Sequence, residues 1–224
     1  MKERLSYETI ALRCVKEFQD GDYVNLGIGI PNLCAILIPP EKQIHLHAEQ
    51  GVLGYGRLLR DDEYEKADHD YIDAGGRFFV PKPGACFFDM DLSFDMIRGG
   101  HLDIAVLGGL QVSKRGDLAN WAVDTTQLTG NIGGGMDLAV GTKKVIVAMT
   151  HTARDGKHKI VNECTLPLTA KECVDLIVTD LAVIEVNRQG LLLKEIAPGW
   201  TVDEVQSLTE PDLIVSDDLK EIQL

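Results

Sequence analysis

The apolar residues at the start of the chain follow a helical period. From Ile10 to Phe18 they recur at every third or fourth position, which predicts an amphipathic helix that ends before Gly21. Apolar spacing and stop signals predict three further helices. They cover residues 34–38, 92–97 and 170–176. Thr201 and Glu204 have the spacing of a capping box, which predicts the start of a last helix.

Strands are predicted where apolar residues run continuously or alternate with polar ones. A continuous run, which fits a parallel sheet covered on both faces, lies at residues 103–109, and further strands are predicted at residues 23–26 and 143–149. Shorter strands are expected at residues 78–80, 182–186 and 191–196, and residues 187–190 have the composition of a hairpin turn. This order predicts one α/β domain over residues 1–224, with a mostly parallel sheet and an antiparallel edge near the C-terminus.

The segment from Ile44 to Gly56 carries the most specific local pattern. Apolar and polar residues alternate up to Glu49, with His45 and His47 on the same face as the glutamate, which is a strand pattern. Three glycines follow at positions 51, 54 and 56 and predict a turn. Glu49 is therefore expected at the end of a strand. In open α/β sheets, ligands bind beyond the carboxyl ends of the strands.

Three interpretations of Glu49 compete. An isolated acid after a strand is commonly a surface carboxylate. His45, His47 and Glu49 together could ligate a metal, but alternating histidines on a half-exposed strand more often face solvent, and we expect no metal site. A carboxylate can also act as a nucleophile when preorganised backbone surrounds it. The local residues do not decide between the surface acid and the nucleophile.

Two more glycine turns follow predicted strands. Gly27 and Gly29 precede Pro31, where backbone N–H groups can approach an anion at a helix start, although a tight strand-to-helix turn is the alternative. Residues 133–135 are three successive glycines, for which a flexible loop is the alternative. Together these turns indicate a protein that binds an anionic or nucleotide-bearing ligand.

Composition narrows the class of protein. The 224 residues carry a net charge of −13, which argues against nucleic acid or an anionic membrane as a partner. No apolar run approaches the roughly 20 residues of a membrane span, and no signal peptide is visible. The five cysteines are scattered without a C-x-x-C pair, which predicts a reduced, cytoplasmic setting.

Several longer stretches resemble the β subunit of family I CoA-transferases, a family that includes the 3-oxoacid and butyrate–acetoacetate types. These stretches follow one another along nearly the whole chain, at residues 25–31, 46–54, 87–101, 107–121, 133–137, 143–152 and 164–169. The resemblance implies a single three-layer domain of the CoA-transferase type, a fold shared with sugar-phosphate isomerases. It also implies a coenzyme A thioester as substrate and no permanently bound cofactor.

The resemblance assigns Glu49 the role of nucleophile. In the family this glutamate forms an acyl anhydride and then a glutamyl-CoA thioester, so that coenzyme A passes between two carboxylic acids by a ping-pong mechanism. The expected substrates are short-chain acyl-CoA esters, such as acetoacetyl-CoA, with acetate, butyrate or succinate as partner acid. The residues expected to bind substrate or coenzyme A are Asn25, Gly27, Gly29, Gln50, Gly51, Gly133 and Gly134.

The chain departs from the family pattern near the nucleophile. Residues 48–51 read Ala-Glu-Gln-Gly instead of the usual Ser-Glu-Asn-Gly, and Arg57 stands where a proline is common. Residues 124–127 replace a Pro-Gly-Lys, with one extra residue. Because these positions surround the expected acyl pocket, we expect them to affect substrate identity first.

The family's β subunit works with an α subunit. The chain matches only that half, which implies a separate α chain, an α2β2 assembly and no activity for the chain alone. An acyl-CoA hydrolase is the nearest enzymatic alternative, and a non-catalytic domain that binds coenzyme A or a metabolite is another. A sugar-phosphate isomerase is disfavoured, since few lysines or arginines flank the glycine turns.

Overall fold

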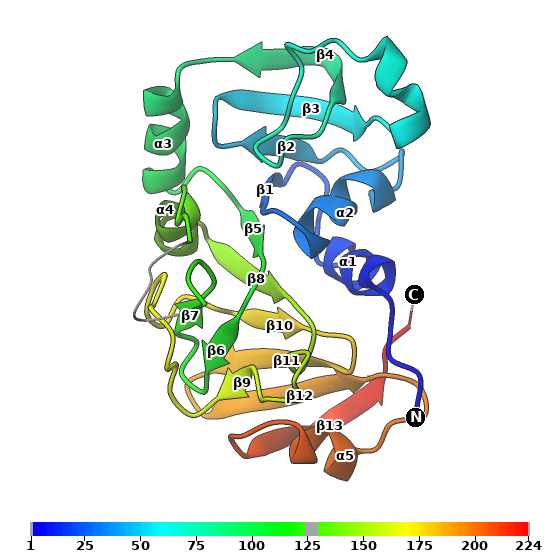
Figure 1. The fold of residues 1–224 in the computed structure, drawn as a ribbon, viewed down its shortest axis with the longest axis vertical. Coiled ribbons are helices and arrows are strands. Elements are labelled where there is room, and N and C mark those ends of the chain that lie inside the picture. The colour runs from blue at the N-terminus through cyan, green and yellow to red at the C-terminus, as the bar shows by residue number, and fades with distance from the viewer. Residues whose placement is uncertain (1, 124–129, 224) are drawn as a thin grey trace.

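Parallel strands form the centre of a ten-stranded sheet in the computed structural model, which describes residues 2–123 and 130–223 (Figure 1). In order across the sheet, the central strands are β10 (Leu176–Val178), β8 (Lys144–Ala148), β5 (Ile104–Leu107), β1 (Tyr23–Leu26) and β2 (His45–Ala48). The strands predicted at 23–26, 103–109 and 143–149 are therefore confirmed as β1, β5 and β8. The departure at residues 124–127 lies outside the described residues.

Antiparallel strands extend the sheet at both edges. Beyond β10 lie β11 (Ala182–Asn187) and β12 (Gly190–Ile196), joined by the predicted hairpin, and then β13 (Leu213–Glu221), which runs parallel to β12. Beyond β2 lie β3 (Val52–Leu58) and β4 (Phe79–Phe87). The predicted C-terminal antiparallel edge is confirmed, whereas the second one, at β3 and β4, was not predicted.

Helices cover both faces of the sheet and give three layers. One face carries α1 (Tyr7–Val15) and α2 (Ile30–Leu37). The other carries α3 (Met90–Arg98), α4 (Gly135–Gly141), α5 (Val202–Ser207) and a small sheet of β6 (Gln111–Ser113), β7 (Leu118–Ala119) and β9 (Ile160–Val161). A 3₁₀ helix, η1 (Asp61–Lys66), lies between β3 and β4.

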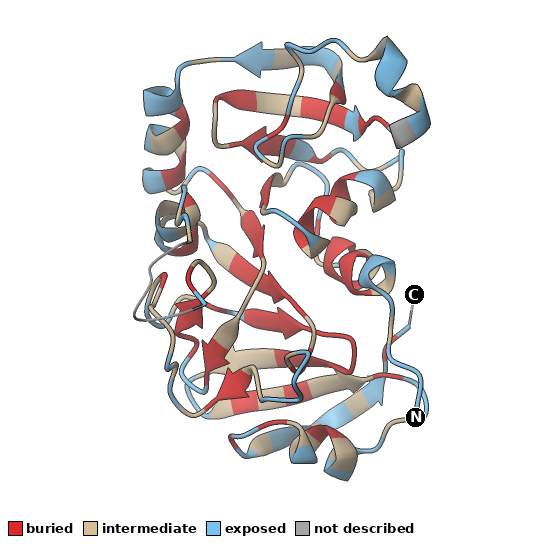
Figure 2. Cartoon of the chain, viewed as in Figure 1, coloured by how far each residue is buried: buried red, intermediate tan, exposed pale blue. Residues whose placement is uncertain are grey.

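The central strands are buried on both faces (Figure 2). Along β5, Ile104 and Val106 pack into the core beneath α1 and α2, while Ala105 and Leu107 pack into the core on the opposite face. Neither face of β5 meets water, and all four of its residues are apolar. The continuous apolar runs in the sequence have this cause.

Two predictions about β3 and β4 are wrong. Gly54 and Gly56 lie inside β3 rather than in a turn. Gly54 has a φ of +80° at a bulge, and a Cβ at Gly56 would overlap the Val80 carbonyl of β4. The prolines after Val80 do not end β4, because an edge strand leaves one side of its backbone unpaired and tolerates residues without N–H donors.

The helix predicted at residues 170–176 is also wrong. This segment instead pairs with the turn between β6 and β7. The N–H groups of Cys173 and Val174 both donate to the Gly116 carbonyl, and Ala170 forms a bridge with Leu118. Tertiary hydrogen bonds therefore override a weak helical pattern, and the backbone of Glu172 adopts a φ of +48°.

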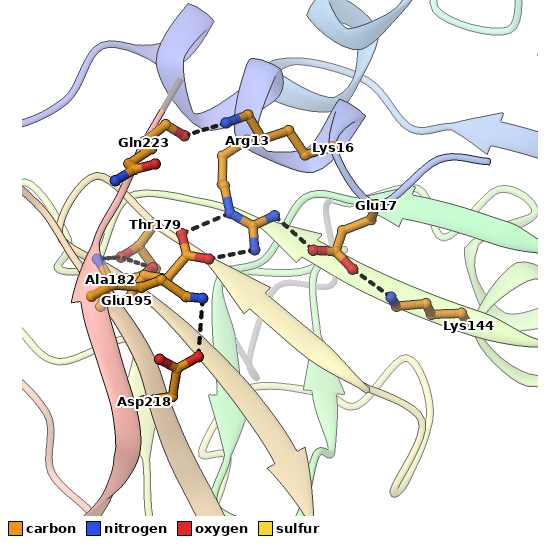
Figure 3. Close-up of polar contacts among 10 residues, drawn as sticks. Arg13, Lys16, Glu17, Lys144, Thr179, Ala182, Glu195, Asp218 and Gln223 are labelled. Atoms are coloured by element: carbon orange, nitrogen blue, oxygen red, sulfur yellow. Dashed lines mark hydrogen bonds and ion pairs between the residues drawn. The ribbon is translucent and has the colours of Figure 1, made fainter. Parts of the chain in front are cut away.

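Arg13 ties α1 to the sheet through buried ion pairs (Figure 3). Its Nε and Nη2 donate to the two carboxylate oxygens of Glu195 on β12, at 2.8 and 2.9 Å. Its Nη1 donates to Glu17 at 2.7 Å, and the other oxygen of Glu17 accepts from Lys144 at 2.7 Å. The Arg13 residue is only 8% exposed, so its charge is matched inside the protein rather than by water.

Candidate active site

Glu49 lies in the tight turn that follows β2 and leads into β3. The Gly51 N–H donates to the Ala48 carbonyl at 3.0 Å and closes this turn. Gly51 has a φ of +115°, and a Cβ there would overlap the Phe88 carbonyl. Only glycine fits this position, so Gly51 shapes the turn that presents Glu49.

The backbone before α4 closes on the Glu49 carboxylate. The Gly134 N–H donates to Glu49 Oε1 at 3.4 Å. A Cβ at Gly134 would overlap Glu49 Oε2, and one at Gly133 would lie 3.5 Å from Oε1. Gly134 has an ordinary φ of −81°, so its lack of a side chain serves the close approach of the carboxylate and not the backbone conformation.

A cavity of about 330 Å³ surrounds Glu49 at the carboxyl ends of β1, β2 and β5. Five residues that the sequence predicted for the site line it: Glu49, Asn25, Gly27, Gly133 and Gly134. The other three, Gly29, Gln50 and Gly51, do not. Hollows of about 600 and 750 Å³ lie elsewhere, the first around the ion pairs of Arg13, but neither is lined by residues at the carboxyl ends of β1, β2 and β5.

His47 is fully buried beneath this site, so the expectation that it faces solvent is wrong. Its Nδ1 lies 3.0 Å from Asn25 Nδ2, which also donates to the His47 carbonyl at 3.2 Å. Its Nε2 lies 3.0 Å from the hydroxyl of Ser93 on α3. Burial lowers the pKa of His47 to about 4, so the ring is neutral near pH 7. A neutral ring accepts from Asn25 and donates to Ser93.

The strand-face metal site is not formed by these residues. His45 is exposed and stacks on Tyr23, with ring centroids 4.9 Å apart, whereas His47 points into the protein. Within residues 2–123 and 130–223, no group of three or more His, Cys, Asp or Glu side chains is arranged to hold a metal ion. In the same ranges, no helix has the length and apolar character needed to cross a membrane.

Comparison with known proteins identifies the family of this chain. The sequence profile described as Coenzyme A transferase matches residues 7–208. The chain belongs to the coenzyme A transferase family. The resemblance drawn from the sequence is thereby confirmed, and the α/β fold class with it.

Two relatives differ in how much of their own length this chain covers. The chain is 45% identical over 217 residues to the acetate CoA-transferase subunit beta of Haemophilus influenzae, covering 97% of this chain and 95% of that one. It is 45% identical over 224 residues to human mitochondrial succinyl-CoA:3-ketoacid coenzyme A transferase 2, covering 99% of this chain but 43% of that protein. The chain thus spans less than half of the human relative.

A solved structure supports the fold. The apoenzyme of an acyl-CoA transferase from Escherichia coli O157:H7 has a TM-score of 0.74 to this chain at 22% sequence identity. The match covers 100% of this chain and 45% of that one. At this identity the likeness shows the CoA-transferase fold and no more.

Several residues that line the Glu49 cavity were not singled out from the sequence, among them Ala74, Asn120 and Trp121. Asn120 and Trp121 are fixed by hydrogen bonds to the Gly108 carbonyl, the Thr169 hydroxyl and the Leu168 carbonyl. Both belong to the stretch 107–121 that resembles CoA-transferases, and this was the available signal. Ala74 lies in a loop with no such signal.

Proposed function

We propose that this chain is the catalytic β-type subunit of a CoA-transferase, with residues 1–224 as one catalytic domain and Glu49 as the nucleophile. The observation that supports this most directly is the Gly134 N–H at 3.4 Å from the Glu49 carboxylate, inside a cavity at the carboxyl edge of the sheet. A surface acid would not require a glycine from a segment 85 residues away in the sequence.

The proposed reaction has two symmetrical halves. The Glu49 carboxylate attacks the thioester carbonyl of an acyl-CoA, giving an acyl-glutamyl anhydride and free CoA thiolate. The thiolate attacks the glutamyl carbonyl, forms a glutamyl-CoA thioester and releases the first carboxylate. A second carboxylate attacks this thioester, and the released thiolate then takes the new acyl group, which regenerates Glu49.

The Gly134 N–H has the right placement to assist the steps at the glutamyl carbonyl. Each attack on that carbonyl places negative charge on its oxygen, and Glu49 Oε1 already accepts from Gly134. A backbone donor aimed at a developing oxyanion contributes about 10²–10³ in rate in comparable sites. Asn25, Gly27 and Gly133, which also line the cavity, are the proposed contacts of the acyl group and the thioester.

The proposed partner is a CoA-transferase α subunit on a separate chain, in an α2β2 assembly. The chain covers nearly all of one protein named as a subunit beta and less than half of the human transferase. A cavity of about 330 Å³ holds an acyl group but not a whole coenzyme A, so further surface is required. We expect the chain alone to be inactive, and we expect short 3-oxoacyl-CoA substrates and a cytoplasmic location.

Mass spectrometry of the trapped intermediate tests the proposal. The chain, purified with its α partner, is incubated with acetoacetyl-CoA, treated with borohydride and digested with trypsin. Borohydride reduces a glutamyl thioester to the alcohol. The tryptic peptide 43–57 contains Glu49 and no other Asp or Glu, so a reduced carboxyl in this peptide identifies the residue.

The controls separate the outcomes. The mark is expected in the wild-type complex and in Glu41→Ala, which changes an exposed glutamate on the neighbouring tryptic peptide, and not in Glu49→Ala. Release of free acid without an acceptor, and without a mark, would indicate an acyl-CoA hydrolase. Neither mark nor turnover in the intact complex would refute the role of Glu49.

A further inference from the structure

Residues 72–74 form a fixed part of the wall of the Glu49 cavity. Ala74 lines the cavity directly. Asp73 is 5% exposed, and its Oδ1 accepts from the N–H groups of Gly75 and Arg77, both at 2.8 Å. The Asp73 N–H donates to the Arg77 carbonyl at 2.9 Å. The wall is therefore a closed turn and not an open loop.

Gln50 connects this wall to the nucleophile turn. It follows Glu49 directly, and its Nε2 donates to the Ile72 carbonyl at 2.7 Å. This hydrogen bond links the residue next to Glu49 with the segment that contains Ala74. The Gln50 amide N–H group donates to a backbone carbonyl, and Gln50 does not line the cavity. The amide therefore holds the wall and does not face the substrate.

The length of the Gln50 side chain matters for this contact. Asparagine, the residue usual in the family, is one methylene shorter and would fall short of the Ile72 carbonyl by about 1.5 Å, beyond hydrogen-bond range. The buried Oε1 of Gln50 has no donor within reach among the described residues. An unmatched buried acceptor costs stability, so the contact is not explained by stability alone.

We infer that Gln50 is a positioning residue that fixes the 72–74 wall against the nucleophile turn, and that Ala74 sets the size of the acyl group that the cavity accepts. This inference rests on the proposed CoA-transferase function. The Ala74 side chain is exposed to the cavity, so a larger side chain would occupy acyl space without disturbing the core. The cavity of about 330 Å³ is near the lower limit of ligand pockets, which favours short acyl groups.

The test compares acyl-CoA donors of increasing length. For the complex with the α partner, kcat/KM is measured with acetyl-CoA and butyryl-CoA, and their ratio is the readout. Ala74→Leu is expected to lower the butyryl to acetyl ratio by about tenfold or more, because the larger leucine side chain occupies the space that the longer butyryl chain needs. Ala74→Val, a smaller change, should give an intermediate ratio.

The role of Gln50 is tested by combining its substitution with that of Ala74 in a double variant. In Gln50→Asn the wall is no longer held, so the butyryl to acetyl ratio should rise. In the double variant, Ala74→Leu should have a clearly smaller effect than in the wild type, since a loose wall can move away. Matched controls are Gln43→Asn, an exposed glutamine outside the cavity, and Ala153→Leu, a half-exposed alanine on a distant turn. Neither control should change the ratio.

The outcomes separate this inference from the proposed function. The role of Ala74 alone is refuted if the wild-type complex transfers CoA and carries the mark at Glu49, but the Ala74→Leu complex has the same butyryl to acetyl ratio as the wild type. Independent effects of Gln50→Asn and Ala74→Leu refute the positioning role of Gln50. A wild-type complex without transfer refutes the proposed function, and this inference with it.

Discussion

The regions around Arg13 and around Glu49 both bury polar side chains, but the hydrogen bonds of these side chains lead to different parts of the molecule. Around Arg13, the charged groups pair with one another through Glu17 and Glu195, and the network ends on the sheet. Around Glu49, the hydrogen bonds run from Ser93 through His47 to Asn25, which lines the cavity. The contacts of Arg13 hold the fold together, while those of His47 end at a residue that lines the same cavity as the candidate nucleophile.

The two buried histidines show why burial alone does not identify a site. His151 is as fully buried as His47, and burial lowers the pKa of each to about 4. The partners of His151 are the hydroxyls of Thr179 and Thr209, both at 2.9 Å, and neither lines the Glu49 cavity. A shifted pKa is therefore a weak sign of function here, and the connection to the cavity is the stronger one.

The largest expected effect is on stability in the Arg13 region. Arg13→Met leaves the Glu195 carboxylate, whose side chain is only 14% exposed, without its bidentate partner, so the free energy of unfolding should fall by about 3–5 kcal/mol. Urea denaturation measures this loss. Arg57→Met removes an equally bidentate pair, to Glu63 at 2.7 Å, but on the surface, and should change stability little. Equal losses in both variants would show that burial does not distinguish the two pairs.

Acid should destabilise the chain through both histidines. The pKa of each falls from its ordinary 6.5 to about 4 on folding, so the unfolded chain binds these protons first. Their contribution is fully present above pH 6.5 and is lost as the pH falls towards 4, by about 3 kcal/mol for each ring. Unfolding at several pH values measures the slope.

Glutamine variants of the two histidines show how much of this pH dependence each histidine contributes. His47→Gln and His151→Gln should each flatten the dependence of stability on pH between 6.5 and 4. Only His47→Gln should also change the transfer rate per folded complex, since Asn25 loses its partner at the cavity wall. A change in rate of the same size in His151→Gln would remove the distinction between the two histidines.

The next effect is on activity. Gly134→Ala keeps a backbone conformation that alanine adopts, but its Cβ would overlap the Glu49 carboxylate. A displaced nucleophile costs about 100-fold in rate, so kcat should fall by that order while the melting temperature of the complex changes little. Steady-state kinetics beside thermal unfolding test this. A variant that melts early and keeps its kcat would show that Gly134 serves the fold.

How much of this was accessible from the sequence depends on the range of the contacts. β5 and most of β8 could be predicted because a strand buried on both faces leaves a continuous apolar run. The burial of His47 could not, since its partner Ser93 lies 46 residues away on α3. For the same reason Gly54 and Gly56 read as a turn, although pairing with β4 makes them part of a strand.

The candidate site shows the same limit. Glu49 was identifiable as an acid at a strand end, but the local pattern is more commonly that of a surface carboxylate. The approach of Gly134 to Glu49 was expected only from the resemblance to CoA-transferases, because no local rule relates positions 85 apart. The roles of Ala74 and Gln50 could be recognised only from the structure, since no sequence pattern indicates a hydrogen bond from Gln50 to the Ile72 carbonyl.

The smallest effect is expected at the glycine turn after β1. Gly29 has a φ of +90°, no atom within 4 Å of the position a Cβ would take and no part in the cavity lining, so Gly29→Ala should cost about 2 kcal/mol of stability through backbone strain. The transfer rate per folded complex should stay close to that of the wild type. Gly133→Ala meets similar strain at a φ of +50°, but its Cβ would contact Glu49 Oε1 at 3.5 Å, so it should also lower the rate modestly. If Gly29→Ala lowers kcat as much as Gly134→Ala does, Gly29 itself contacts the substrate as the sequence predicted, and the cavity extends beyond its present lining towards the start of α2.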